Sequence, residues 1–312
     1  MKKFRTIFMG TPDFSVPCLA RLAEITEIIG VVTQPDKPRG RGQKLTPSPV
    51  KAFAMEKGFT VYQPAKIKTE EFTRILKDLQ PDLMVVVAFG QILSQQILDI
   101  PAYGCINVHA SLLPRYRGAA PIQWSVINGE KLTGVTTMFM DAGLDTGDML
   151  LKTEVPITED MIAEELHDAL MEAGADLLVK TVAKIADGTI QRIHQADADS
   201  NYAPMLSKET GHIDWTKPAW DIHNLVRGLN SWPGAYSILQ GKTFKIWRTR
   251  VADAEAVCEP GEILELTKQG FLAGTGKGIL EILEIQAPNK KKMAASDYVR
   301  GHGLELHLKF EA

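Results

Sequence analysis

The first 190 residues alternate between short strand-like runs and longer segments in which apolar positions recur with a helical spacing. Strands are predicted at 6–9, 28–33, 83–88, 104–109 and 135–140, and helices at 13–24, 49–57, 69–79, 119–128 and 161–186. The run 83–88 is apolar at every position, as expected of a central parallel strand covered on both faces. This alternation predicts an α/β domain with a Rossmann-like, doubly wound and mostly parallel sheet.

The pattern changes after a polar stretch at 190–206. Beyond it, a helix is predicted at 218–227, followed by short strands at 235–239, 243–248, 261–266, 271–273 and 278–285. Closely spaced short strands are typical of a small barrel, and an OB-like barrel is one form of it. We therefore expect a Rossmann-like domain at 1–189, a linker at 190–206 and a C-terminal OB-like β-barrel domain at 207–312.

Two polar residues share one face of the strand predicted at 104–109. Side chains two positions apart on a strand point the same way, so Asn107 and His109 lie together while Ile106 and Val108 face the core. Ligands of open α/β sheets bind beyond the carboxyl ends of the strands, which is where this pair is predicted. An amide can donate to a developing oxyanion and an imidazole can move a proton, so the pair suits acyl or formyl transfer.

A carboxylate that could orient the imidazole lies in the turn-rich segment 141–148, at another predicted carboxyl end. It is Asp145, and we take Asn107, His109 and Asp145 as the predicted catalytic residues. A strand-end Asn or His taken alone more often satisfies backbone groups, but the shared face favours the functional interpretation. The segment lacks the alternating ligands and final Glu of a calcium loop, and there is no His/Cys cluster for zinc, so we expect no metal.

Composition narrows the class of protein without deciding it. The chain has 312 residues, of which 45% are hydrophobic and 23% charged, with a net charge of −3 and three cysteines. These values are ordinary for a globular enzyme, and the sparse, odd set of cysteines fits a reducing compartment. No apolar run approaches the ~20 residues that span a bilayer, and the N-terminal run is too short for a signal peptide, so we expect a cytoplasmic protein.

A long basic loop at 34–49 stands out in this slightly acidic chain. Counted through position 51, five basic residues oppose Asp36 and give a net charge of +4; they are Lys37, Arg39, Arg41, Lys44 and Lys51. Strand-to-helix connections are usually ~2–6 residues long. Charged runs are often only solvated surface, yet a long basic loop at the ligand edge favours a phosphate-rich partner. A second basic cluster, in the predicted barrel, consists of Lys290, Lys291 and Lys292.

Taken together, these segments resemble the methionyl-tRNA formyltransferase family. The matching segments extend along nearly the whole chain, at 10–14, 34–49, 107–123, 140–148 and 213–215. The third and fourth contain elements common to enzymes that use formyltetrahydrofolate and so indicate the chemistry, whereas the basic loop singles out the tRNA enzyme. The resemblance implies transfer of the formyl group of 10-formyltetrahydrofolate to the free amino group of methionyl initiator tRNA, for translation initiation.

The resemblance also implies a site for each substrate. The folate is expected at three segments, whose residues are Ala88, Phe89, Gly90, Gln91, Ser111, Leu112, Leu113, Pro114, Phe139, Met140 and Asp141. The tRNA is expected at the two basic clusters, with residues Lys37, Arg39, Arg41, Lys44, Lys290, Lys291 and Lys292. Arg41 is the expected key residue of the loop that enters the acceptor stem. We expect a monomer without a membrane partner.

Two other interpretations stay open from the sequence. Another formyltetrahydrofolate enzyme could formylate an amino sugar or glycinamide ribonucleotide, or hydrolyse the folate, although the basic loop and second domain argue against a small acceptor. A non-catalytic RNA-binding protein would not need Asn107, His109 and Asp145 together. The sequence also leaves open whether His109, Asp145 or water carries the proton between amine and leaving group.

Overall fold

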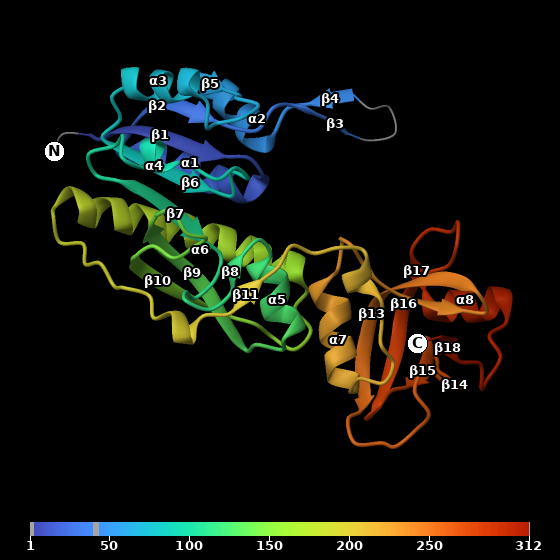
Figure 1. Cartoon of the computed structure of the whole chain (residues 1–312). Coiled ribbons are helices and arrows are strands. Elements are labelled where there is room, and N and C mark those ends of the chain that lie inside the picture. The colour runs from blue at the N-terminus through green and yellow to red at the C-terminus, as the bar shows by residue number, and fades with distance from the viewer. Residues whose placement is uncertain (1–2, 40–43, 312) are drawn as a thin grey trace. The chain divides into compact units, whose positions relative to one another are not determined.

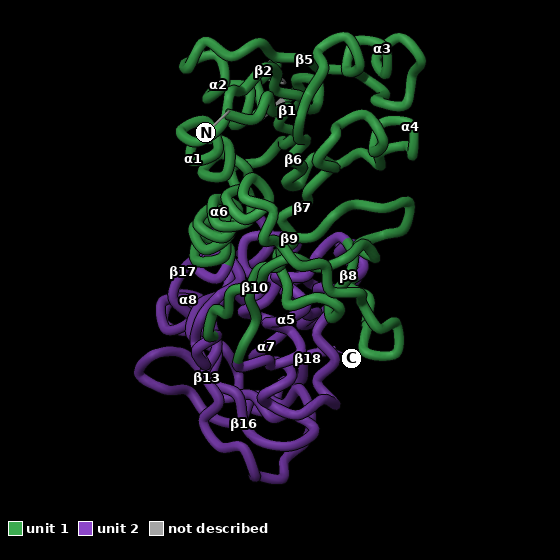
Figure 2. The backbone as a smooth tube through the Cα atoms, turned by 90° about the vertical axis from the view of Figure 1, so that its left-hand side faces the viewer, with its two compact units in different colours: residues 1–118, 132–156, 167–203 green, residues 119–131, 157–166, 204–312 purple. Residues whose placement is uncertain are grey.

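The computed structural model describes residues 3–39 and 44–311 and contains two compact units, each assembled from separate stretches of chain (Figure 2). The first unit comprises 1–118, 132–156 and 167–203, and the second comprises 119–131, 157–166 and 204–312. Each unit is built around its own seven-stranded sheet. No helix in the described part of the chain is long and apolar enough to cross a bilayer.

The sheet of the first unit is mostly parallel (Figure 1). Its strands are β1 (Arg5–Gly10), β2 (Glu27–Val32), β5 (Val61–Tyr62), β6 (Leu83–Val87), β7 (Cys105–His109), β9 (Leu132–Phe139) and β10 (Met149–Pro156). They are arranged in the order β10-β9-β7-β6-β1-β2-β5, and the five strands from β7 to β5 run parallel. The Rossmann-like prediction is therefore confirmed.

Helices cover both faces of this sheet. They are α1 (Val16–Ile25), α2 (Pro49–Glu56), α3 (Glu70–Asp78), α4 (Gln95–Leu98) and α6 (Ala163–Ala186), with the 3-10 turn η1 (Asp13–Ser15) before α1. On one face, Phe72 of α3 shares a buried apolar cluster with Met84 and Cys105 of the strands. On the other face α6 approaches closely, because a Cβ added at Gly174 would lie 3.2 Å from the Val108 side chain. This is the doubly wound arrangement.

The direction of β9 differs from that of its neighbours. β9 pairs antiparallel with β7, so that Phe139 lies opposite Ile106 and Thr136 lies opposite His109. The segment 141–148 does follow the carboxyl end of its strand, as predicted, but that end lies beside the beginning of β7 rather than beside its end. The reason is that β9 and β10 form an antiparallel hairpin at this edge of the sheet. The chain between them must fold back to reach His109.

The sheet of the second unit is antiparallel. Its strands are β12 (Ala235–Leu239), β13 (Lys242–Asp253), β14 (Ile263–Leu266), β15 (Phe271–Gly274), β16 (Ile279–Gln286), β17 (Met293–Ala294) and β18 (Phe310–Glu311), and its helices are α5 (Pro121–Ile127), α7 (Ala219–Gly228) and α8 (Ala295–His302). The order is β14-β15-β16-β13-β12-β18, with β17 paired to β16. Trp215 stacks on Phe310 in its core, with ring centroids 5.0 Å apart. The prediction of a small C-terminal OB-like β-domain is confirmed.

Residues 157–166 belong to the second unit because α7 holds their backbone. The Arg227 guanidinium donates to the carbonyls of Thr158, at 3.2 Å, and Met161, at 2.9 Å. His223 Nε2 lies 3.1 Å from the Glu159 carbonyl, which can only accept, so this nitrogen carries a hydrogen. Burial lowers the pKa of His223, which favours the neutral ring in this position.

Six short elements complete the described part of the chain. A hairpin of β3 (Lys37–Arg39) and β4 (Lys44–Thr46) lies in the predicted basic loop. A parallel pair is formed by β8 (Arg117–Gly118) and β11 (Tyr202–Ala203). Two 3-10 turns, η2 (Asp197–Asp199) and η3 (Glu209–Gly211), lie on either side of β11 in sequence.

Candidate active site

β7 carries the first two residues of the predicted catalytic set. Ile106 and Val108 are buried in the core, as predicted, while Asn107 is half-buried and His109 is buried at the end of the strand. Among the described residues, none contributes a hydrogen bond to the Asn107 side chain. Its amide therefore keeps an N–H group for an acceptor from outside the protein.

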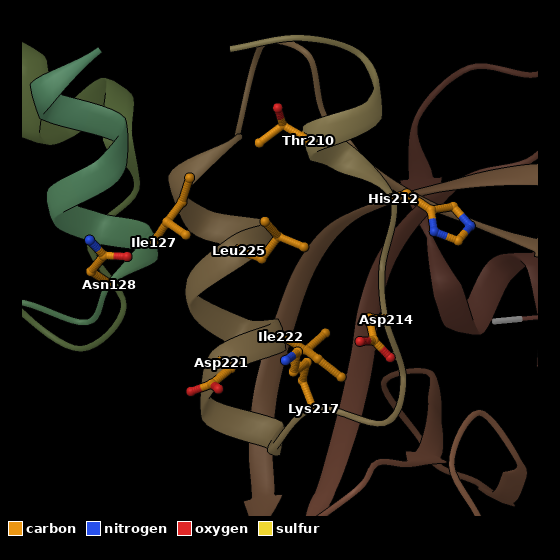
Figure 3. A pocket seen from close by; sticks show the side chains of 9 residues that line it. All are labelled: Ile127, Asn128, Thr210, His212, Asp214, Lys217, Asp221, Ile222 and Leu225. Atoms are coloured by element: carbon orange, nitrogen blue, oxygen red, sulfur yellow. The ribbon is translucent and has the colours of Figure 1, made fainter. Parts of the chain in front are cut away.

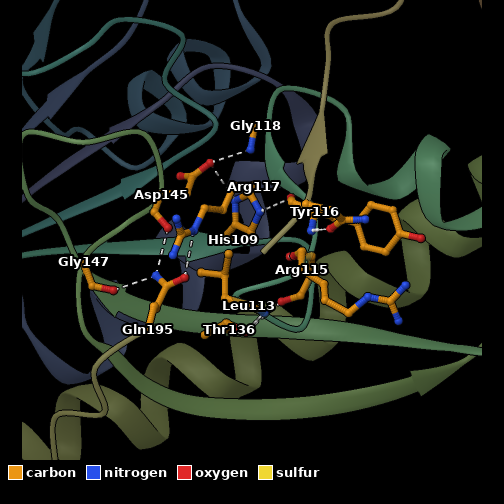
Figure 4. A network of polar contacts seen from close by, with 12 residues as sticks. His109, Leu113, Arg115, Tyr116, Arg117, Gly118, Thr136, Asp145, Gly147 and Gln195 are labelled. Carbon is orange, nitrogen blue, oxygen red and sulfur yellow. Dashed lines mark hydrogen bonds and ion pairs between the residues drawn. The ribbon is translucent and has the colours of Figure 1, made fainter. Parts of the chain in front are cut away.

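Both nitrogens of the His109 ring face oxygen atoms (Figure 4). Nε2 lies 2.9 Å from the carbonyl oxygen of Tyr116, and Nδ1 lies 3.6 Å from Oδ2 of Asp145. Because a carbonyl can only accept, Nε2 carries a hydrogen and Nδ1 is the nitrogen at which a proton can be gained or lost. The structure thus brings His109 and Asp145 together, as the sequence led us to expect.

Asp145 is held in place by its own backbone conformation and by β8. Its φ is +54°, in the left-handed region that non-glycine residues rarely adopt. Its Oδ2 accepts a hydrogen bond of 2.9 Å from the backbone N–H of Gly118. The same oxygen faces the imidazole, so the carboxylate bridges β8 and His109.

Two residues of this network were not predicted as site residues. Gln195 is 2% exposed and donates from Nε2 to the carbonyls of Asp145 and Gly147, and Arg117 donates from Nε to Gln195 Oε1 (Figure 4). Gln195 lies in the segment interpreted as a linker. Because most of its neighbours are also polar, the sequence does not indicate that this glutamine is buried. The sequence shows Arg117 as a basic residue shortly after β7, but it gives no indication that Gln195 and Asp197 are its partners.

The segment 111–114, predicted to contact folate, forms a turn fixed by the edge of the sheet. Ser111 Oγ donates to the Arg115 carbonyl at 2.6 Å, and the Thr136 hydroxyl on β9 both donates to Ser111 O and accepts from Leu113 N. Lys152 donates from its ammonium to the Leu113 carbonyl, and burial lowers the pKa of this lysine. Among the four predicted residues, Leu113 buries its side chain completely and Leu112 and Pro114 are half-buried.

The segment 88–91 leaves β6 in an unusual backbone conformation. Ala88 and Gly90 are exposed and have φ values of +46° and +84°. The side chains of the other two predicted residues are engaged by the protein itself: Phe89 is buried in the core, and Gln91 hydrogen-bonds both Ile67 N and Pro64 O. A ligand at this segment would therefore meet mainly backbone.

The third predicted folate segment begins where β9 ends. The Arg192 guanidinium lies 4.1 Å from the centre of the Phe139 ring, a cation–π contact. Met140 donates its N–H to the Cys105 carbonyl at 2.8 Å. The carboxylate of Asp141 accepts from Gly143 N and Thr146 Oγ1, so it shapes the loop that carries Asp145.

The predicted basic loop is anchored at its base. Lys51 Nζ pairs with the Asp36 carboxylate at 2.6 Å, and Gln63 also donates to it, so these hydrogen bonds lower the pKa of Asp36. Lys51 is thus neutralised within the protein, whereas Lys37 on β3 is exposed. Arg41 lies outside the described residues. Of the remaining predicted tRNA contacts, Arg39 ends β3 and Lys44 begins β4.

The second basic cluster lies in the second unit, between β16 and β17. Lys290 and Lys291 are exposed, while Lys292 pairs with Glu284 at 2.7 Å. Lys292 and Lys245 also lie over the Trp247 ring, 5.7 and 5.3 Å from its centre. The cluster therefore combines exposed cations with an aromatic ring.

A cavity of about 460 Å³ lies in the second unit (Figure 3). It is lined from α5, η3, α7 and the connecting chain by Ile127, Asn128, Thr210, His212, Asp214, Lys217, Asp221, Ile222 and Leu225. None of the predicted site residues lines it, and its charges are mixed in sign. In the described part of the chain, no group of three or more His, Cys, Asp or Glu could hold a metal ion.

Comparison with known proteins decides the family. The chain matches the formyl transferase family model over residues 4–182 and the formyl transferase C-terminal domain model over 205–303. It is 52% identical to the methionyl-tRNA formyltransferase of Clostridioides difficile, over 97% of this chain and 99% of that protein. The chain belongs to the methionyl-tRNA formyltransferase family. The protein of that name from Geobacter sulfurreducens is also 52% identical, over 98% of this chain and 96% of its own length.

Solved structures share the fold at low sequence identity. An N-formyltransferase from Helicobacter canadensis, in complex with folinic acid and dTDP-3-aminofucose, has a TM-score of 0.68 at 20% identity, covering 90% of this chain and 99% of that one. HypX from Aquifex aeolicus, in complex with tetrahydrofolic acid, has a TM-score of 0.63 at 16% identity, covering 100% of this chain and 51% of that one. Membership of the methionyl-tRNA formyltransferase family confirms the resemblance found in the sequence.

Proposed function

We propose that this chain is a methionyl-tRNA formyltransferase, which transfers the formyl group of 10-formyltetrahydrofolate to the free amino group of methionyl initiator tRNA for translation initiation. The observation that carries the proposal is the arrangement of Asn107, His109 and Asp145 at the end of β7. The Asn107 amide, which has no hydrogen-bond partner among the described residues, lies two positions before His109, and the His109 ring faces the Asp145 carboxylate. Relatives of the same name that match nearly the whole chain support it.

The reaction requires an attack, an oxyanion and one proton transfer. The α-amino nitrogen of the methionyl group attacks the formyl carbon, and the carbonyl oxygen becomes an oxyanion. The Asn107 amide would stabilise it by a hydrogen bond, and the His109 ring, when positively charged, by its charge. The bond from the formyl carbon to N10 of the folate then breaks. The proton lost by the amine passes to N10, so that formylmethionyl-tRNA and tetrahydrofolate are formed without another reactant.

His109 Nδ1 is the atom of this chain that best fits the proton transfer. Nε2 is occupied by the Tyr116 carbonyl at 2.9 Å, whereas Nδ1 faces Asp145 and can accept or release a proton. Asp145 would stabilise the ring when it is positively charged. The carboxylate is itself held by Gly118 N, so it acts as a fixed negative charge beside the ring.

Each substrate has a proposed binding surface. The folate would be bound by the segments 88–91, 111–114 and 139–141, mainly through backbone groups at the first. The tRNA phosphates would be bound by the basic residues on the β3–β4 hairpin and by Lys290–Lys292 in the second unit. We further propose a monomeric, cytoplasmic enzyme, organised as a catalytic domain at 1–189, a linker at 190–206 and a tRNA-binding domain at 207–312.

A formyl-transfer assay with three acceptor conditions tests the function. Purified protein would be given 10-formyltetrahydrofolate with charged initiator tRNA, charged elongator methionyl-tRNA or no acceptor. We expect formylmethionine on the initiator tRNA, with an equal amount of tetrahydrofolate released. Release of tetrahydrofolate without an acceptor would indicate a hydrolase instead, and the absence of formylation on initiator tRNA would refute the proposal.

A further inference from the structure

Gln195 is a buried residue in the segment 190–206, and its side chain contacts the loop carrying Asp145. Its neighbours from Gln191 to His194 are exposed, whereas only 2% of Gln195 is exposed. Its side chain makes three hydrogen bonds, which involve Asp145 O at 2.8 Å, Gly147 O at 2.7 Å and Arg117 Nε at 3.1 Å. The amide therefore connects the catalytic loop to β8.

Arg117 fixes which way the Gln195 amide points. A guanidinium has only donors, so the oxygen of the amide must face Arg117 and the NH₂ group must face the two loop carbonyls. A reversed amide would set an oxygen against two carbonyl oxygens and an NH₂ group against a guanidinium. Arg117 is held in turn by Asp197, through Nη1 at 2.9 Å. Donors and acceptors thus match at every contact of Gln195.

The short strand β8 and the residue before it also contact both members of the proton-transfer pair, His109 and Asp145. Its residue Gly118 donates to the Asp145 carboxylate, and the preceding Tyr116 carbonyl accepts from His109. Gln195 therefore ties the backbone of Asp145 to the element that contacts its side chain. Positions 141–144 of the loop are exposed, so Gln195 is its buried polar contact on the side of β8.

We propose that Gln195 is a positioning residue for the formyl-transfer step, which holds the Asp145 carboxylate beside His109 by binding the carbonyls of Asp145 and Gly147. The inference rests on the proposed function. Gln195 touches no reacting atom and acts through Asp145. Its loss should lower kcat and leave substrate binding intact, because a displacement of ~1 Å from the productive geometry can cost ~10² in rate.

Two substitutions at Gln195 separate its roles. Gln195→Met removes all three hydrogen bonds at similar volume. Gln195→Glu keeps an acceptor for Arg117 but places an oxygen against the two carbonyls, so it disturbs only the contact to the loop. Gln191→Met is the matched control, since Gln191 lies four residues away and is exposed. Steady-state kcat and KM for both substrates would be measured with initiator methionyl-tRNA, together with thermal unfolding of each variant.

We expect both Gln195 variants to lose about 10²-fold in kcat with KM changed less than about threefold, and Gln191→Met to match the wild type. In an Asp145→Asn background, Gln195→Met should cause no further loss, because residues that act as a unit are not additive. The inference would be overturned if the losses in kcat of Gln195→Met and Asp145→Asn multiplied in the double variant, or if Gln195→Glu kept the wild-type kcat. If Gln195→Met does not fold, Gln195→Glu decides the question. An inactive wild type would instead refute the proposed function.

Discussion

The amide of Asn107 and the imidazole of His109 differ in whether other residues of the protein already contact their polar atoms. His109 meets Tyr116 O through one nitrogen and Asp145 through the other, so its orientation is set before any substrate binds. The Asn107 side chain receives no hydrogen bond from the described residues. The protein itself thus fixes the imidazole, while the amide keeps an N–H group that a substrate oxygen would accept from under the proposed function.

Replacing Asn107 tests the oxyanion role directly. We expect Asn107→Ala to lower kcat by ~10²–10³, because loss of one oxyanion donor typically has that effect. Binding of the folate should be largely kept, since the amide contributes mainly when the oxyanion forms. Folate affinity by fluorescence and single-turnover formylation would be compared, with Gln191→Ala as the control. A variant within a few-fold of wild type would contradict the assignment.

The cysteines provide a second prediction at single residues. Burial raises the pKa of Cys18 and of Cys105 to about 12, so at pH 8 both are neutral thiols and unreactive. Cys258 is partly exposed. We expect a thiol reagent at pH 8 to modify Cys258 alone in the native protein, and all three thiols after denaturation. Rapid native labelling of Cys105, located by mass spectrometry, would show that β7 opens.

At the scale of secondary-structure elements, the β9–β10 hairpin determines the shape of the site. It turns the loop 140–148 back along the sheet, and Gly147 allows the close approach that this needs. A Cβ at Gly147 would lie 1.8 Å from the Phe139 carbonyl oxygen, and one at Gly134 would lie 2.0 Å from Thr153 O. Both positions therefore require glycine because there is no room for a Cβ atom, and not because the backbone adopts a left-handed φ.

Gly147→Ala should destabilise this hairpin. We expect the free energy of unfolding to fall by about 2–3 kcal/mol or more, because backbone atoms must move to admit the methyl group. Gly301→Ala is the control: it lies near the end of α8 with nothing within 4 Å of an added Cβ, and should be neutral or stabilising by up to ~1 kcal/mol. Urea unfolding would be followed by circular dichroism. Tryptophan fluorescence would report on the second unit alone, because all five tryptophans lie there, whereas Gly147 lies in the first unit. Equal effects of the two substitutions would contradict the expectation.

The elements that could be predicted from the sequence are those with a local signal. The apolar run at 83–88 and the alternation at 104–109 identify β6 and β7, and the shared face of Asn107 and His109 follows from strand geometry. The direction of β9 and the burial of Gln195 depend on partners distant in sequence. The local sequence of β9 does not indicate which strand it pairs with, and that of Gln195 does not indicate which groups it contacts.

At the scale of the whole molecule, basic residues gather in two segments in spite of the net charge of −3, and the proposed function gives them a large anionic substrate. Lys51 is neutralised by Asp36 at the base of the basic loop, whereas Lys37 on β3 is exposed. In the second unit, Lys290 and Lys291 are exposed beside the Lys292–Trp247 contact. Two separate basic surfaces are expected of an enzyme that binds more than the end of its tRNA.

Arg41→Ala tests the basic loop at 34–49. We expect kcat/KM for charged initiator tRNA to fall about 10–100-fold, the range for loss of a charge-assisted hydrogen bond, with folate binding unchanged. The slope of log affinity against log salt should become shallower by about 0.9 if one phosphate contact is lost. Lys77→Ala, on the exposed side of α3, is the control for a general charge effect. Equal loss of folate affinity would point to a disturbed fold.

The interleaving of the two units has a consequence for dividing this protein into fragments. A single cut between 203 and 204 would leave α5 and 157–166 on the amino-terminal piece. The α7 helix, which packs against α5 and whose Arg227 binds the Thr158 carbonyl, would be on the other piece. The cut would therefore divide the second unit, while the first unit would stay whole but carry two stretches that belong to the second. A split or transplanted version must keep both pieces together or redesign the surfaces that the cut exposes.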